Sequence, residues 1–186
     1  AGIIGMLLGL VAGVSGGWID GIIMRVMDAM MSLPMIIMAL FIGSVLGKGL
    51  LNVMLSVGIA MVPRYARLTR GQVLSVKSLD FVIAGTIGGA SRARNALRHI
   101  LPNCISPIIV LMTMNLGTAI LAEAGLSFLG LGISPPMASW GAMVSDGYKY
   151  LSQHPVLSIA PGLCIILIVL SFNIVGDALR DALDPR

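Results

Sequence analysis

VLSIAPGLCIILIVLSFNIV, residues 156–175, is the stretch that decides the fold class, because it contains no Asp, Glu, Lys or Arg. An α-helix needs about 20 mainly apolar residues to cross the hydrocarbon core of a bilayer. Inside a bilayer the backbone polar groups must be paired internally, and a helix achieves this within one segment. The stretch therefore predicts a membrane-spanning helix.

Four further apolar segments extend this pattern to most of the chain; they cover residues 1–17, 22–45, 50–63 and 104–124. Of the 186 residues 57% are hydrophobic and 11% charged, whereas a soluble domain carries roughly 25% charged residues. We therefore predict an all-α, polytopic transmembrane helical bundle, a single domain over 1–186 with about five spans. The chain opens inside an apolar stretch, so we expect it to be the C-terminal part of a longer protein with six spans.

The first apolar segment contains a regular repeat of glycine. Glycine recurs every four residues at Gly5, Gly9, Gly13 and Gly17, which predicts a helix face for close packing against a neighbouring helix.

Between and within these segments, polar residues and a proline predict interruptions. Residues 18–25 include Asp20 and predict a short polar break, and Pro34 predicts a kink in the second span. Arg25 and Asp28 lie three residues apart, which predicts a local ion pair.

The basic residues predict the orientation of the chain. Five alternating spans place residues 64–103, the 18–25 break and the C-terminus on one side, where ten basic residues gather: Arg25, Arg64, Arg67, Arg70, Lys77, Arg92, Arg94, Arg98, Arg180 and Arg186. The other side holds Lys48 and Lys149. Because positive charge marks the cytoplasmic side, loop 64–103 and the C-terminus are predicted to be cytoplasmic. The net charge of +4 then reflects topology, and we expect no nucleic-acid partner.

Motifs for catalysis, cofactors and metals are missing from the sequence. GSVLGKG (43–49) lacks the first glycine and the final Ser or Thr of a nucleotide-binding loop. His99 and His154 fall on opposite sides of the predicted membrane, and Cys104 and Cys164 lack ligand spacing. We therefore predict no catalytic, cofactor-binding or metal-binding residues, and we interpret both cysteines as small buried hydrophobes.

Residues 64–103 are the least membrane-like part of the chain, and they contain a predicted loop of short helices at 76–100. Within them SLDFVIAGTIGGA (78–90) is too short to span a bilayer and predicts one or two short helices with a glycine-rich break. Two interpretations stay open on physical grounds: a surface through which a partner drives transport, or an ordinary loop whose charges fix topology.

DFVIAGTIGGASRARNALRHILPN (80–103) resembles the signature loop of binding-protein-dependent ATP-binding-cassette permeases, which reads E-A-A, three residues, Gly, a spacer and Leu-Pro. The matching positions are Ile83–Ala84–Gly85, Gly89 and Leu101–Pro102, with Asp80 at an acidic position before the motif. PRYARLTRGQVLS (63–75), LAEAGLSFLGLG (121–132), PPMASWGAM (135–143) and FNIVGDALRDALDPR (172–186) resemble the dipeptide, oligopeptide and nickel branch of that family, specifically its second permease subunit without the first span. The chain departs from the signature at Ile83, where the family has Glu, and at Gly85, where it has Ala.

The resemblance implies a type I importer of the bacterial or archaeal inner membrane. Its expected partners are a second homologous permease, two ATPase subunits that carry ATP and magnesium, an extracytoplasmic substrate-binding protein and membrane lipid. The 76–100 loop would couple ATP hydrolysis to transport. The cargo stays open among short peptides, nickel complexes and other small solutes, and the alternatives to an ATP-driven permease are an ion-coupled carrier and a non-transporting scaffold.

Two groups of residues are candidates for specific roles. In the loop, Gly88 and Gly89 would form a turn between coupling helices or an ordinary helix end. Arg92, Arg94 and Arg98 would pair with acidic groups of the ATPase or with lipid headgroups.

The second group is predicted to lie at the outer face. Glu123 is an acid near the outer end of a span, and it would line the cargo pathway or hold the 127–154 loop by a hydrogen bond. Trp140 and Asp146, in that loop, are the other candidates for a pathway or outer gate.

Overall fold

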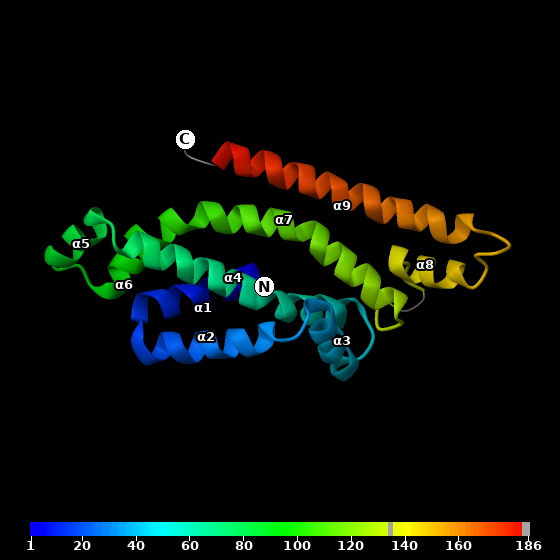
Figure 1. Ribbon diagram of the computed structural model, residues 1–186, viewed down its shortest axis with the longest axis horizontal. Coiled ribbons are helices and arrows are strands. Elements are labelled where there is room, and N and C mark those ends of the chain that lie inside the picture. The colour runs from blue at the N-terminus through cyan, green and yellow to red at the C-terminus, as the bar shows by residue number, and fades with distance from the viewer. Residues whose placement is uncertain (134–135, 184–186) are drawn as a thin grey trace. The chain divides into compact units, whose positions relative to one another are not determined.

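The structure, a computed structural model, describes residues 1–133 and 136–183, and within these ranges every regular element is helical (Figure 1). The all-α prediction is confirmed. Pro135 and Arg186, which belonged to the motifs and to the charge count, lie outside the described residues.

Helices follow one another with short connections. Their bounds are α1 (Gly2–Ser15), α2 (Gly17–Met31), α3 (Met35–Leu46), α4 (Leu50–Lys77), α5 (Asp80–Ile87), α6 (Arg92–Asn95), a π-helical turn η1 (Ala96–Ile100), α7 (Leu101–Phe128), α8 (Trp140–Tyr148) and α9 (Val156–Leu183). α4 continues through Pro63 without interruption. α8 was not predicted.

The first turn between helices lies before residues 18–25, where polar residues predicted a break. Residues 18–25 are helical within α2, so the predicted polar break is wrong. The chain turns instead at Gly16 and Gly17, whose φ angles of 65° and 56° favour glycine. Gly17 therefore belongs to this turn and not to the glycine face of α1.

The predicted kink at Pro34 is present and large. α2 ends at Met31 and α3 begins at Met35, and the two axes differ by 91°. Pro34 provides no backbone N–H, which is compatible with the position just before a helix but not with its interior.

Among the described residues, two helical stretches are long and apolar enough to cross a membrane, Arg92–Phe128 and Val156–Leu183. The bent pair α2–α3 makes a third if it counts as one span. α1 is apolar but has only 14 residues, and the second half of α4 is rich in arginine. The number of five spans therefore stays a prediction.

The chain forms two compact units, and α4 and α7 contribute residues to both. Unit 1 consists of Ala1–Leu33, Met61–Met112 and Arg180–Arg186, and unit 2 of Pro34–Ala60 and Thr113–Leu179.

In unit 1 the glycine face of α1 packs directly on the second half of α4. A Cβ atom on Gly5 would lie 2.5 Å from Cβ of Tyr65, and one on Gly13 would lie 2.5 Å from Cγ1 of Val73. The predicted close packing is thus confirmed for the glycines inside α1.

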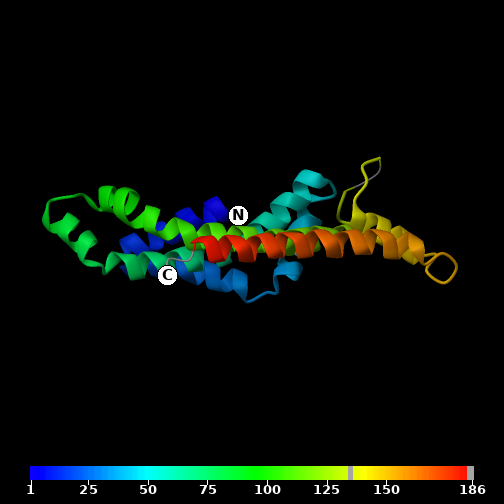
Figure 2. The ribbon, with the colours of Figure 1, turned by 90° about the horizontal axis from the view of Figure 1, so that it is seen from above.

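A buried cluster in unit 1 joins five elements: Leu10 of α1, Val73 and Val76 of α4, Val82 of α5, Ala96 and Ile100 of η1, and Cys104 and Ile108 of α7. Both views show α5 and α6 beyond the C-terminal end of α4 and the N-terminal end of α7 (Figures 1 and 2). The cluster therefore fixes these two short helices to the rest of the unit.

In unit 2, α7 packs against α8 and α9, again at glycines. A Cβ on Gly117 of α7 would lie 3.2 Å from Val169 of α9, and one on Gly147 of α8 would meet the backbone of Leu157 at 2.6 Å. The ring of Phe128 meets that of Tyr148 edge-on, with centroids 6.3 Å apart.

Candidate functional site

The segment predicted to couple transport to ATP hydrolysis folds as a helical hairpin, α5–α6. Asp80 lies in the first turn of α5, where a negative charge is favourable at a helix N-terminus. Ser91 caps α6 by accepting a hydrogen bond from the backbone N–H of Arg94 at 3.2 Å. The prediction of one or two short helices with a glycine-rich break in residues 78–90 is confirmed: α5 lies in this range and the break follows it, while α6 begins just beyond, at Arg92.

Gly89 makes the turn between these helices. Its φ of 85° lies in the left-handed region, whereas Gly88 has a φ of −71° that any residue can adopt. The backbone N–H of Gly89 donates to the carbonyl of Thr86 at 3.1 Å, and that of Ala90 donates to the carbonyl of Gly85 at 3.0 Å. Glycine after the last helical turn is the usual way to satisfy these carbonyls. Of the two predicted glycines, only Gly89 is required by the backbone.

A buried amide clamps the hairpin together. Asn95 of α6 is 5% exposed, and its Nδ2 donates to Oγ1 of Thr86 on α5 at 2.9 Å. A Cβ atom on Gly85 would lie 2.9 Å from Oδ1 of Asn95. Gly85, a departure from the family signature, therefore leaves room for this amide.

The outward face of α5 is apolar and exposed. Phe81, Ile83 and Ile87 are 45%, 46% and 83% exposed, and Leu97 of η1 is 62% exposed. Ile83 and Ile87 are one helical turn apart. Where the family signature has Glu, this chain therefore presents a hydrocarbon side chain on the same surface as Ile87. Ala84 is exposed as well.

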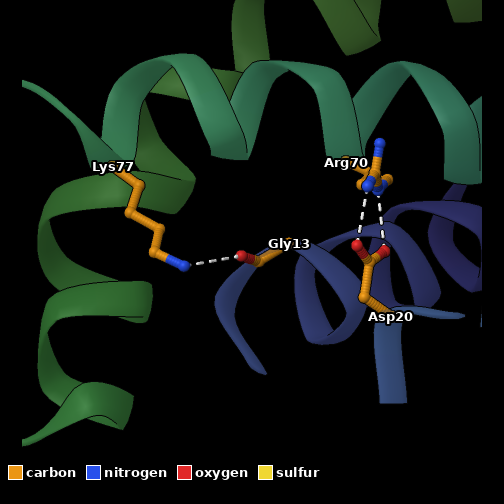
Figure 3. Close-up of polar contacts among 4 residues, drawn as sticks. All are labelled: Gly13, Asp20, Arg70 and Lys77. Atoms are coloured by element: carbon orange, nitrogen blue, oxygen red, sulfur yellow. Dashed lines mark hydrogen bonds and ion pairs between the residues drawn. The ribbon is translucent and has the colours of Figure 1, made fainter. Parts of the chain in front are cut away.

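The arginines separate into two classes. Arg70 of α4 binds both carboxylate oxygens of Asp20 of α2 through one edge of its guanidinium, with Nε donating to Oδ1 at 2.7 Å and Nη2 donating to Oδ2 at 2.6 Å (Figure 3). Arg67 pairs with Asp28, so the predicted Arg25–Asp28 pair is wrong. These two acids of α2 therefore tie it to α4.

The arginines of the hairpin form the second class. Arg92, Arg94 and Arg98 are exposed, and within the described ranges they form no ion pair. They stay available to an outside partner.

Leu101 and Pro102 of the signature begin α7. Leu101 packs against the buried cluster, whereas Pro102 lines an open groove of about 620 Å³ together with Gln72, Asn103, Ser106 and Arg180. The hydroxyl of Ser106 donates to the carbonyl of Leu183 at 3.2 Å, which holds the end of α9 at this groove.

In unit 2 the structure brings Glu123 and Trp140 together. Both line a pocket of about 320 Å³ that is otherwise mostly apolar, with Ile120, Met143 and Ile168 in its wall. Oε1 of Glu123 accepts a hydrogen bond from the Ser127 hydroxyl at 2.6 Å, one turn further along α7. Ser127 is the first residue of the predicted 127–154 loop, but in the structure it lies within α7, so this bond joins two residues of one helix.

Asp146 is not part of that pocket. It forms an exposed pair with Lys149, whose Nζ lies 2.8 Å from Oδ1. The hydrogen bond to this carboxylate raises the pKa of the Lys149 ammonium. A role of Asp146 at a pathway or outer gate stays a prediction.

Two features of these sites were not predicted, the Asn95 clamp and the pairing of α2 acids with α4 arginines. Neither has a periodic signal in the sequence, because each joins residues of different helices. Among the described residues, no group of three His, Cys, Asp or Glu side chains could hold a metal ion. The expectation that the chain binds no cofactor stays a prediction.

Comparison with known proteins agrees with the pattern of motifs. Residues 5–186 match the family model described as binding-protein-dependent transport system inner membrane component. The chain is 45% identical over 99% of its length to the dipeptide transport system permease protein DppC of Alkalihalophilus pseudofirmus, covering 60% of that protein. It is 44% identical over 98% of its length to the glutathione transport system permease protein GsiD of Pectobacterium atrosepticum, covering 61% of it.

A third relative is the probable D,D-dipeptide transport system permease protein DdpC of Escherichia coli, 44% identical over 100% of this chain and 62% of its own length. The chain thus spans about 60% of the length of these relatives. A family match over nearly the whole sequence, together with the helical fold and the signature hairpin, shows that the chain belongs to the binding-protein-dependent transport system inner membrane component family.

Proposed function

We propose that this chain is part of the permease subunit of an ATP-driven importer and that α5–α6 is its coupling element. A second homologous permease completes the pathway, two ATPase subunits supply the energy, and an external binding protein delivers the cargo. The chain itself is not an enzyme. The observation that carries the proposal is the apolar, exposed face of α5 on a hairpin that is rigidly joined to two long helices.

Rigid connection matters because a coupling element must transmit displacement. α4 ends at Lys77 and α5 begins at Asp80, while α6 continues through η1 into α7 without a loop. Val82, Ala96 and Ile100 share one buried cluster with α4 and α7, so the hairpin cannot move without moving these helices. Binding energy at the hairpin then shifts the helices only if the partner binds two conformations with different affinity.

The exposed side chains suit docking into a cleft. Ile83 and Ile87 form an exposed apolar pair one helical turn apart on α5, and the exposed Arg94 and Arg98 belong to the α6–η1 arm of the same hairpin. Aromatic and aliphatic anchors surrounded by arginine are typical of the centre of a protein interface. We infer that an ATPase subunit covers this surface.

The orientation follows from the same assignment. ATPase subunits are cytoplasmic, so α5–α6 and the C-terminal end of α9 lie in the cytoplasm, in line with the excess of basic residues there. A membrane-impermeant thiol reagent tests this on Ile87→Cys, since Ile87 is 83% exposed; Cys164, which is also exposed, is first replaced by Ser. Labelling of intact cells at position 87 would contradict the orientation.

Cargo is proposed from the pocket and from the names of the relatives. A carboxylate beside an indole ring, in an otherwise apolar wall, suits a primary ammonium next to hydrocarbon. Short peptides have such an ammonium at their N-terminus. We therefore propose short peptides as cargo, with Glu123 and Trp140 as the residues that contact them.

Gly89 allows the coupling proposal to be tested with matched variants. Valine is strained at a φ of 85°, whereas asparagine tolerates the left-handed region. The transporter carrying Gly89→Val should assemble but lose most ATP-driven peptide uptake in proteoliposomes, and Gly89→Asn should retain it. Equal uptake by both variants would show that the turn has no part in coupling.

A further inference from the structure

A second site lies in unit 1, where the end of α1 meets α4, α5 and α6. It is a cavity of about 240 Å³ lined by Val14, Ser15, Lys77, Val82, Thr86, Arg92, Asn95 and Ile100. Two of these side chains are cations, and the described lining includes no acid. The cavity is therefore electrostatically suited to an anion.

Lys77 and Arg92 both have more N–H groups than the contacts described for them use. The ammonium of Lys77 donates one hydrogen bond, to the carbonyl of Gly13 at 3.3 Å, which directs it to the C-terminal end of α1 (Figure 3). An ammonium has three N–H groups and a guanidinium five. Arg92 forms no ion pair in the described part of the chain. A phosphate group between Lys77 and Arg92 could accept several of these hydrogen bonds.

The exterior of α1 indicates where the ligand comes from. Ile4, Leu7 and Val11 are 56%, 51% and 48% exposed, and their spacing places them on one side of the helix. The opposite, glycine-bearing side packs on α4. Continued by one turn, the exposed stripe reaches Val14 and Ser15, which line the cavity. An apolar stripe thus ends at a cationic cavity.

We propose that this cavity binds the headgroup of an anionic phospholipid. Its phosphodiester lies between Lys77 and Arg92, and an acyl chain follows Ile4, Leu7 and Val11. The bound lipid fills the space between α1 and the coupling hairpin. This assignment needs only that the chain is a membrane protein, and it does not depend on the proposed cargo or energy source.

Lipid retention by the purified transporter tests the proposal. Native mass spectrometry would compare phosphatidylglycerol with phosphatidylcholine, whose headgroup has no net charge. A basic residue near an anionic headgroup contributes about five-fold in affinity, so Lys77→Gln with Arg92→Gln should lower phosphatidylglycerol affinity about 25-fold. Phosphatidylcholine should bind the unmodified protein more weakly than phosphatidylglycerol, and equal retention of the two lipids would contradict the proposal.

Arg94→Gln is the matched control for charge, because Arg94 is on the same helix but does not line the cavity. Equal loss of phosphatidylglycerol from Arg94→Gln and from Arg92→Gln would overturn the proposal in favour of a diffuse surface potential. Displacement of the lipid by micromolar glycerol 1-phosphate would assign the cavity to a soluble phosphate ester instead.

A photoreactive benzophenone amino acid at Val11 of the assembled transporter provides an independent measurement that needs no loss of charge. It should cross-link lipid. A cross-link to the other permease subunit would show that protein covers the stripe, and the lipid assignment would then be wrong.

Discussion

Replacing Gly9 by alanine should destabilise the protein, although alanine is the better helix former. Gly9 lies on the face of α1 that packs against α4. A Cβ there would lie 2.7 Å from Cβ of Thr69 and 2.9 Å from the backbone nitrogen of Arg70. Carbon atoms in ordinary contact are about 3.5 Å apart, so α1 would have to move away by about 0.8 Å.

The size of the effect follows from two opposing contributions. Inserting a methyl group into a closely packed interface costs about 1–3 kcal/mol, while the higher helix propensity of alanine returns up to about 1 kcal/mol. A net destabilisation of roughly 1–2 kcal/mol is expected. Gly71→Ala on α4 is the control, because a Cβ at Gly71 meets nothing within 4 Å.

Thermal unfolding in detergent, followed by circular dichroism, would measure both variants. Gly9→Ala should lower the unfolding midpoint by several degrees, and Gly71→Ala should leave it unchanged or raise it slightly. If Gly9→Ala unfolds at the same temperature as Gly71→Ala, the packing of α1 on α4 described here is wrong.

Three further predictions concern the ion pairs, the hairpin and the pocket. Arg70→Met should lower the free energy of unfolding by roughly 1–3 kcal/mol, because it leaves the carboxylate of Asp20, which is only 15% exposed, without its partner. Arg67→Met, which removes an exposed pair, should change it by less than about 1 kcal/mol, and chemical denaturation of the two variants would measure the difference. Gly85→Ala should displace the amide of Asn95 and speed hydrogen exchange in residues 80–95, and adding Asn95→Ala to it should produce much less than the sum of the two single effects. Glu123→Gln should weaken uptake of peptides that have a free N-terminal ammonium but not of N-acetylated ones, and normal transport of both kinds would show that Glu123 does not contact cargo.

Hydropathy and glycine spacing predicted the local elements well, because both signals act within one helix. The apolar stretch 156–175 lies inside α9, and the break in residues 78–90 occurs at Gly89, where the backbone needs a positive φ. Pro34 marked the bend between α2 and α3 because a missing backbone donor is a local property.

The errors came from polar residues whose partners are distant in the sequence. Asp20 suggested a break, yet the helix accommodates it because Arg70, 50 residues away, neutralises its carboxylate. Asp28 suggested a pair with its neighbour Arg25, but its partner is Arg67, 39 residues away. The position of the turn between α1 and α2 decides which acids of α2 face α4. The turn lies at Gly16 and Gly17, and Gly17 also continues the four-residue glycine repeat, so the spacing of the glycines alone did not reveal it.

These ion pairs divide the basic residues into two groups. Arg67 and Arg70 of α4 are neutralised by acids of the same unit, whereas Arg92, Arg94 and Arg98 of the hairpin form no ion pair in the part of the chain that the structure describes. The hairpin that presents Ile83 and Ile87 therefore also carries three positive charges without an ion pair among the described residues.

A partner that fits this surface must combine an apolar recess with carboxylates around it. Ile83 stands where the signature has an acidic residue, so a cation of the partner cannot form an ion pair at this position. Burial of the exposed Ile83 side chain must then supply the affinity that the ion pair would have given. Contacts of Arg94 and Arg98 weaken as salt screens them, whereas the apolar contact does not. Binding to the proposed ATPase partner should therefore fall with ionic strength to a plateau rather than to zero, and the plateau should disappear in Ile87→Asp.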